Sequence, residues 1–134
     1  MPVVDASVYV AFFKADEAQH VPSRQWLRTA SRGDEPIFSP AILLPEVASA
    51  LGRGLGDAAL ADYAVTLLRS RRLTELLPVT QALAARASKI AAEQRLRGCD
   101  AVYVALAQQL GMELVTFDRD QLERGAAVVM TRTC

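Results

Sequence analysis

The chain of 134 residues is 51% hydrophobic and 22% charged, which is typical of a globular protein and excludes a disordered chain. A single domain is expected to span residues 1–134, because domains cluster around this length. Fifteen basic residues balance fifteen acidic ones, so the net charge is zero. The overall charge therefore gives no indication of a nucleic-acid partner. A polyanion would have to be bound through local patches or metal ions.

Membrane and secreted classes are not favoured. No apolar run reaches the ~18–20 residues that are needed to span a bilayer, so no membrane partner is expected. The N-terminus lacks the charged region, apolar core and cleavage site of a signal peptide. Two cysteines, Cys99 and Cys134, are too few for a disulfide framework or a zinc site. We therefore expect a cytoplasmic protein.

Short apolar runs alternate with longer helical patterns along the chain. Buried strands are expected over 2–5, 36–39, 75–79, 113–117 and 126–130, because these runs are continuous and bounded by turn or charged residues. Helices are expected over 6–15, 17–31, 44–54, 57–71, 80–96 and 100–110. This alternation predicts an α/β fold of three layers, with helices on both faces of a parallel sheet.

A proline interrupts the third expected helix. Proline in a helix interior costs ~3 kcal/mol, and it also disfavours helical angles at the preceding residue. The helix is therefore expected to begin near Pro45 or to be kinked there. Either arrangement places Glu46 close to the start of a helix.

Four acidic residues stand at comparable places in the expected fold. Asp5 ends the first strand, Asp118 follows the fourth, Glu46 opens the helix after the second, and Asp100 opens the last long helix. Sites in open parallel sheets form beyond the carboxyl ends of the strands. The four carboxylates can therefore meet in one pocket.

Such a group of carboxylates indicates a metal ion. Carboxylates within ~4–6 Å raise the pKa of one another and repel. Mg²⁺ prefers oxygen ligands and would relieve that repulsion, and it can activate a water molecule against a phosphate. The sequence has no clustered histidines or cysteines as alternative ligands, since His20 is the only histidine.

Each acid also has an ordinary structural explanation. Asp5 and Asp100 could be N-caps, and Glu46 could complement a helix dipole. Asp118 and Asp120 could be turn residues. The residues alone leave both explanations open.

Three segments together resemble the PIN-domain family. They are VVDASVYVAFF (3–13), PEVASAL (45–51) and CDAVYVALAQQLGMELVTFDRD (99–120). The likeness is strongest to the VapC-like toxins of toxin–antitoxin modules, and it runs from residue 3 to about residue 130. The last segment is the most specific, because an acid opens an apolar helix that leads to a strand ending in Thr116-Phe117-Asp118.

The resemblance implies a PIN-like α/β/α domain with a central parallel sheet of four to five strands. It implies an endoribonuclease that needs Mg²⁺ or Mn²⁺ and is the toxin of a toxin–antitoxin module. It also implies a homodimer and a cognate antitoxin. The acids that match the catalytic, metal-binding positions are Asp5, Glu46, Asp100 and Asp118, with Asp120 a possible substitute for Asp118. Ser7 and Thr116 match polar positions that support the acids.

Two other functions are compatible with the resemblance, namely a non-toxin PIN nuclease in RNA processing and an inactive PIN-like binding module. Pro45 and Cys99, each directly before an acid, depart from the family pattern. Three arginines near the acids, Arg95, Arg97 and Arg119, either contact RNA phosphates or lie on solvated helix surfaces.

Overall fold

The computed structural model describes residues 1–134 and has a central sheet of five strands in the order β3-β2-β1-β4-β5. The strands are β1 (Pro2–Val4), β2 (Phe38–Pro40), β3 (Glu75–Leu77), β4 (Glu113–Val115) and β5 (Thr131–Arg132). Every pair of neighbouring strands is parallel. The predicted parallel sheet is therefore confirmed.

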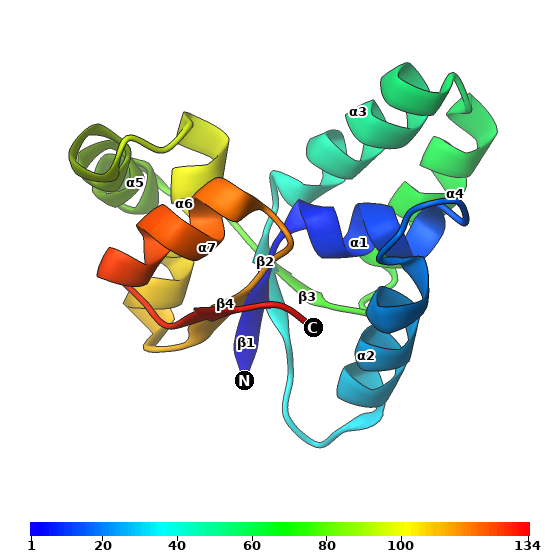
Figure 1. Ribbon diagram of the computed structural model, residues 1–134, viewed down its shortest axis with the longest axis horizontal. Coiled ribbons are helices and arrows are strands. Elements are labelled where there is room, and N and C mark those ends of the chain that lie inside the picture. The colour runs from blue at the N-terminus through cyan, green and yellow to red at the C-terminus, as the bar shows by residue number, and fades with distance from the viewer.

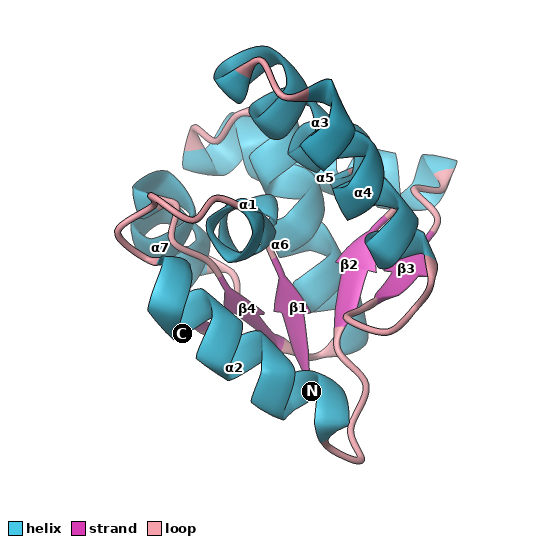
Figure 2. Cartoon of the chain, turned by 90° about the vertical axis from the view of Figure 1, so that its right-hand side faces the viewer, coloured by secondary structure: helices cyan, strands magenta, loops and turns pink.

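The helices form one layer on each side of the sheet. One layer holds α1 (Ala6–Phe13), α2 (His20–Arg32), α3 (Leu43–Leu55) and α4 (Ala58–Arg69). The other holds α5 (Gln81–Gln94), α6 (Gly98–Leu110) and α7 (Arg119–Arg124), as Figures 1 and 2 show. The three-layer α/β/α architecture is thus confirmed. None of these helices has the length and apolar character that a membrane crossing requires.

The core draws buried side chains from the sheet and from helices on both of its faces, with α1 and α6 contributing many of them. Val3 and Val4 of β1 are fully buried, because both faces of a central parallel strand are covered. In α6 the side chains of Tyr103, Val104 and Leu106 are buried with the alanines around them. Helix α6 contacts β1, β2 and β4, so it packs against the central strands of the sheet.

The prediction of a strand over residues 126–130 is wrong. Residues 126–130 begin in a 3-10 helix (Gly125–Ala127), and the edge strand is instead β5. Val128 and Val129 are only half-buried at this edge, so the apolar run does not mark a strand that is covered on both faces. The short helix α7, which precedes it, was not predicted.

The expectation that a helix begins near Pro45 is confirmed. Helix α3 begins two residues earlier, at Leu43, and Pro45 lies in its first turn. The first-turn N–H groups have no partner within a helix, so a residue without an N–H is tolerated there. Glu46 lies in the same first turn, as predicted, and its N–H donates to the Ile42 carbonyl at 3.2 Å.

Candidate active site

Asp5 is positioned by the pairing of β1 with β4. Val4 is the register partner of Val115, and the Asp5 N–H donates to the Val115 carbonyl at 3.0 Å. Beyond this bond β1 ends, and the Asp5 carboxylate caps α1 by accepting from the Ser7 N–H at 3.0 Å. Asp5 is buried, so its carboxylate is held at the carboxyl end of the central strand. It is both an N-cap and a member of the site.

A buried glutamine and threonine fix the orientation of the Asp5 carboxylate. Gln121 Nε2 donates to Asp5 Oδ1 at 3.1 Å and also to the Asp100 carbonyl at 3.3 Å. The Thr116 hydroxyl lies 3.1 Å from Asp5 Oδ2 and 2.6 Å from Gln121 Oε1. Because this hydroxyl has a single proton, it donates to one of these two oxygens at a time.

Ser7 supports the acids indirectly. Its hydroxyl accepts from the Phe117 N–H at 2.9 Å and lies 3.3 Å from the Thr116 hydroxyl. Thr116 in turn accepts from the Asp118 N–H at 2.9 Å. These bonds tie the start of α1 to the loop after β4, and through Thr116 they reach Asp5 and Asp118.

Asp100 and Asp118 are bridged by an arginine. Asp100 lies in the first turn of α6, which begins at Gly98. Arg97 Nε donates to Asp100 Oδ2 at 2.9 Å, and Arg97 Nη2 lies 3.5 Å from Asp100 Oδ1 and 3.8 Å from Asp118 Oδ2. Burial raises the pKa of the Asp100 carboxyl, while the bond from Arg97 lowers it. Asp118 also caps α7, since its Oδ1 accepts from the Gln121 N–H at 2.9 Å.

Glu46 faces the same region from α3. Its Oε1 atom is buried without a hydrogen-bond partner, and so is the hydroxyl of the neighbouring Tyr103. Burial raises the pKa of the Glu46 carboxyl, and the negative charges of Asp5 and Asp100 raise it as well. The Tyr103 hydroxyl lies close enough to lower this pKa, although the two groups make no hydrogen bond of good geometry. Asp118 and Asp5 likewise raise the pKa of the Asp100 carboxyl, so all four acids interact electrostatically although they come from four different segments.

The donor set suits a hard divalent cation. All four predicted side chains offer carboxylate oxygens, and the buried Glu46 Oε1 has no other partner in the protein. As the side chains stand, no three His, Cys, Asp or Glu residues are close enough to hold a metal ion. The assignment of Asp5, Glu46, Asp100 and Asp118 as metal ligands therefore stays a prediction.

The structure separates Asp118 from its alternative, Asp120. Asp120 is exposed and lies 4.0 Å from Arg124, its ion-pair partner on α7. Asp118 shares Arg97 with Asp100 and contacts the buried network through Gln121. This geometry favours Asp118 as the fourth acid.

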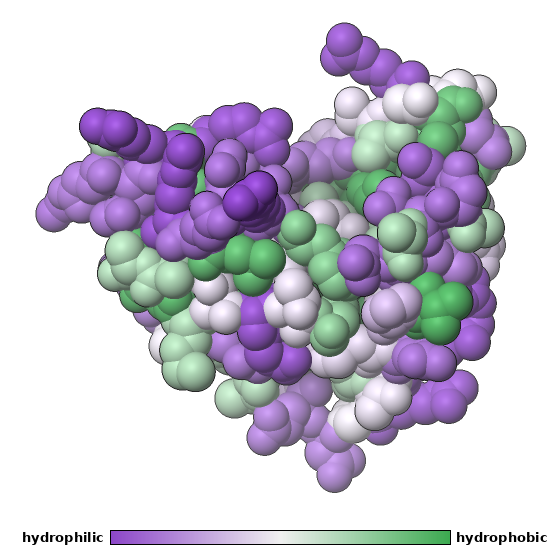
Figure 3. All heavy atoms as spheres, in the orientation of Figure 1, coloured by the Kyte–Doolittle hydropathy of each residue, from purple (hydrophilic) through white to green (hydrophobic).

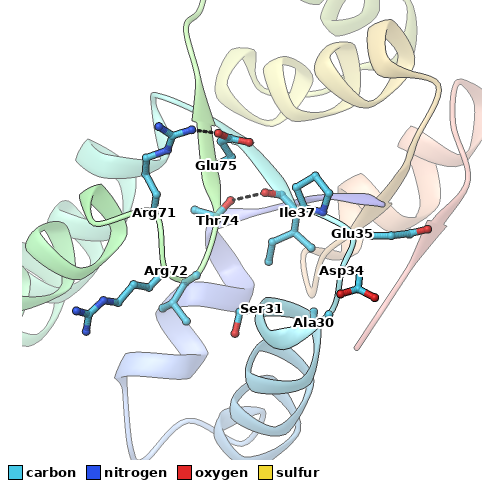
Figure 4. A pocket seen from close by; sticks show the side chains of 12 residues that line it. Ala30, Ser31, Asp34, Glu35, Ile37, Arg71, Arg72, Thr74 and Glu75 are labelled. Atoms are coloured by element: carbon cyan, nitrogen blue, oxygen red, sulfur yellow. Dashed lines mark hydrogen bonds and ion pairs between the residues drawn. The ribbon is translucent and has the colours of Figure 1, made fainter.

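The acids lie at the carboxyl edge of the sheet. In Figure 3 the surface is indented between the two layers of helices at this edge, and hydrophilic side chains crowd the side of α5 and α7. A separate pocket of about 320 Å³ opens at the opposite edge, where Ile37 and Thr74 precede β2 and β3 (Figure 4). Its charged lining includes the Arg71–Glu75 ion pair and none of the four acids.

Two residues of the site, Gln121 and Tyr103, had no predicted role in it. A signal for Gln121 exists in the sequence, because Asp118 and Gln121 have the spacing of a capping box. That spacing would have predicted α7. A capping box also predicts that the Gln121 side chain bonds the backbone at the start of its own helix, whereas it contacts Asp5 at the end of β1.

The comparisons with known proteins concern the family and the fold. The sequence matches the family model of the PIN domain over residues 3–127, and no curated protein matches the chain. VapC20 from Mycobacterium tuberculosis, a toxin that cleaves the sarcin-ricin loop, has a TM-score of 0.80 at 20% identity, with 97% of each chain covered.

Two toxin–antitoxin complexes are also similar in structure. VapBC2 from Rickettsia felis, bound to promoter DNA, has a TM-score of 0.71 at 11% identity and covers 98% of this chain and 97% of its own. DNA-bound VapBC from Salmonella typhimurium has a TM-score of 0.69 at 19% identity, covering 99% and 98%. At these identities the likeness shows a shared fold.

Proposed function

The chain belongs to the PIN-domain family, and from this premise we propose that it is an endoribonuclease that cleaves RNA phosphodiester bonds with bound Mg²⁺ or Mn²⁺. Residues 1–134 would form its single catalytic domain. One observation carries the proposal: the half-buried Glu46 side chain has one buried oxygen, Oε1, without a hydrogen bond, and it lies in the field of Asp5 and Asp100. This arrangement does not stabilise the folded state, because neighbouring negative charges repel one another.

Asp5, Glu46, Asp100 and Asp118 would hold the cation. A bound divalent cation would lower the pKa of a water molecule and neutralise charge on the phosphate. The protein itself supplies the rigid placement of these acids. Gln121 and Thr116 fix the Asp5 carboxylate, and α6 presents Asp100 from its first turn.

We further propose that the protein is the toxin of a toxin–antitoxin module. The similar structures include VapC20, which is a cleaving toxin, and two VapBC complexes. By this analogy the partners would be RNA, a cognate antitoxin and a second copy of the chain, in the cytoplasm. Growth arrest on expression of the wild type, relieved by Asp100→Asn, would support the toxin role. Normal growth despite RNA cleavage in vitro would favour a nuclease of RNA processing.

RNA cleavage by the purified protein tests the enzymatic proposal. Asp5→Asn and Asp100→Asn should each abolish cleavage in Mn²⁺ while keeping the circular dichroism spectrum of the wild type. Asp62→Asn is the matched control, because Asp62 is exposed on α4 and should leave cleavage unchanged. Cleavage that survives EDTA, or that survives both site substitutions, would refute the metal-dependent reaction. Metal uptake without cleavage would indicate a PIN-like binding module.

A further inference from the structure

Arg97 is the one basic side chain that contacts the acids of the site. It is the N-cap residue of α6, yet its side chain makes no capping bond and turns toward Asp100 and Asp118. Arg119 pairs with Glu123 on its own helix, at 3.0 Å. Arg95 precedes α6 in a left-handed conformation, and its carbonyl accepts from Arg124. The three neighbouring arginines therefore have different roles.

The Arg97 guanidinium is held by charge at an exposed position. Its side chain is 77% exposed, while that of Asp100 is 6% exposed. Only the guanidinium side of this ion pair is open to water, so Arg97 can be solvated when it leaves, whereas the buried Asp100 carboxylate then needs another cation in its place. The carboxylates are fixed by the fold, and the guanidinium is not.

A divalent cation would compete with Arg97 for the same oxygen atoms. Asp100 Oδ2 accepts from Arg97 Nε at 2.9 Å, and Asp118 Oδ2 lies 3.8 Å from Arg97 Nη2. A cation bound to these oxygens would also be repelled by the guanidinium charge beside it. Arg97 and the cation should therefore exclude one another from this position.

Resting on the proposed function, we propose that Arg97 is a displaceable counter-cation and a positioning residue for the RNA. It neutralises Asp100 and Asp118 before the divalent cation binds and is released when the cation takes their oxygens. The released guanidinium lies at the rim of the site, where its planar donors bind a phosphate of the RNA. The same side chain thus weakens metal binding and strengthens substrate binding.

Calorimetric titration of the metal-free protein with Mn²⁺ tests whether Arg97 competes with the divalent cation. Arg97→Ala should bind Mn²⁺ about three- to tenfold more tightly than the wild type, since it removes the competing charge. Arg97→Lys keeps a positive charge and should stay closer to the wild type. Arg119→Ala is the matched control, because it removes the same charge one residue from Asp118 without touching a site acid, and it should change the affinity by less than about twofold. Equal Mn²⁺ affinity of Arg97→Ala and the wild type would overturn the proposal.

RNA cleavage at saturating Mn²⁺ tests whether the released Arg97 side chain binds the RNA. Arg97→Ala should raise KM for RNA about three- to tenfold with kcat little changed, because a ground-state phosphate contact is lost. An unchanged KM would overturn the role in RNA positioning.

Asp5→Asn separates this inference from the proposed function. If neither the wild type nor Asp5→Asn takes up Mn²⁺, the metal site itself is refuted, and the inference with it. If the wild type binds Mn²⁺, Asp5→Asn does not, and Arg97→Ala binds no more tightly, only the inference about Arg97 is refuted.

Discussion

The side-chain amide of Gln121 donates a 3.1 Å hydrogen bond to Asp5 Oδ1, joining residues that are 116 positions apart in the chain. Both side chains are buried, and the amide oxygen of Gln121 lies 2.6 Å from the Thr116 hydroxyl. The first and last parts of the sequence are thus joined through an amide and a carboxylate. This contact holds one of the two oxygens of the Asp5 carboxylate in place.

We expect Gln121→Leu to reduce both stability and metal affinity. The substitution leaves Asp5 Oδ1 and the Asp100 carbonyl without their buried donor, which typically costs about 1–3 kcal/mol in the free energy of unfolding. Urea unfolding measures this loss, and Mn²⁺ titration measures the looser Asp5 carboxylate. Gln108→Leu is the control, because its exposed bond to Arg86 should contribute less than about 0.5 kcal/mol. Equal losses in the two variants would contradict the role given to Gln121.

Thr116→Val should be destabilising although the two side chains have nearly the same shape. The lost hydroxyl lies within bonding distance of Asp5 and Gln121 and accepts from the Asp118 N–H, so about 1–3 kcal/mol of unfolding free energy is expected to disappear. Thr116→Ser should restore most of it, because it returns the hydroxyl. Thr66→Val on the exposed side of α4 controls for the change in polarity. If the serine variant were as unstable as the valine variant, methyl packing and not the hydroxyl would explain the loss.

The Glu46 carboxyl should make stability fall as the pH rises in metal-free buffer. Burial raises its folded pKa above the ordinary value of 4.5, so the folded state holds this proton more tightly than the unfolded state. Its contribution is fully present below the unfolded pKa and is lost as the pH rises through the folded pKa. Glu46→Gln removes this effect and should raise Tm at pH 7 by about 2–4 °C.

Thermal unfolding at pH 4 and pH 7 measures the difference for Glu46→Gln. The gain should shrink toward pH 4, where the wild-type carboxyl is mostly protonated in both states. Glu93→Gln, at an exposed site on α5, should show no such trend. A gain of the same size at both pH values would show that burial of the charge is not its cause.

Replacement of Arg95 by glycine should give a more stable protein than replacement by alanine. It has a positive φ of 56° at the C-cap of α5, a conformation that costs other residues roughly 1 kcal/mol more than glycine. Arg95→Gly should therefore be more stable than Arg95→Ala by about 0.5–1 kcal/mol in chemical denaturation. In the middle of α5 the order reverses, so Ala92→Gly should be destabilising by a similar amount. Arg95→Ala more stable than Arg95→Gly would contradict the strain assigned here.

The sequence by itself determined the layers of the fold and the residues that could carry chemistry. Apolar runs that need cover on both faces, separated by helical patterns, permit little other than a parallel sheet between helices. These features follow from patterns of residues that are close together in the sequence.

The tertiary structure decided what the local patterns left open. It placed Asp118 and not Asp120 beside Arg97, turned the Gln121 side chain from its own helix to Asp5, and made the last strand begin after the apolar run at 126–130. Each of these outcomes depends on contacts between segments that are distant in the chain, where burial and charge outweigh local preference. An acid that caps a helix and an acid that serves a site look alike in the sequence, because only the fold determines which other charges face it.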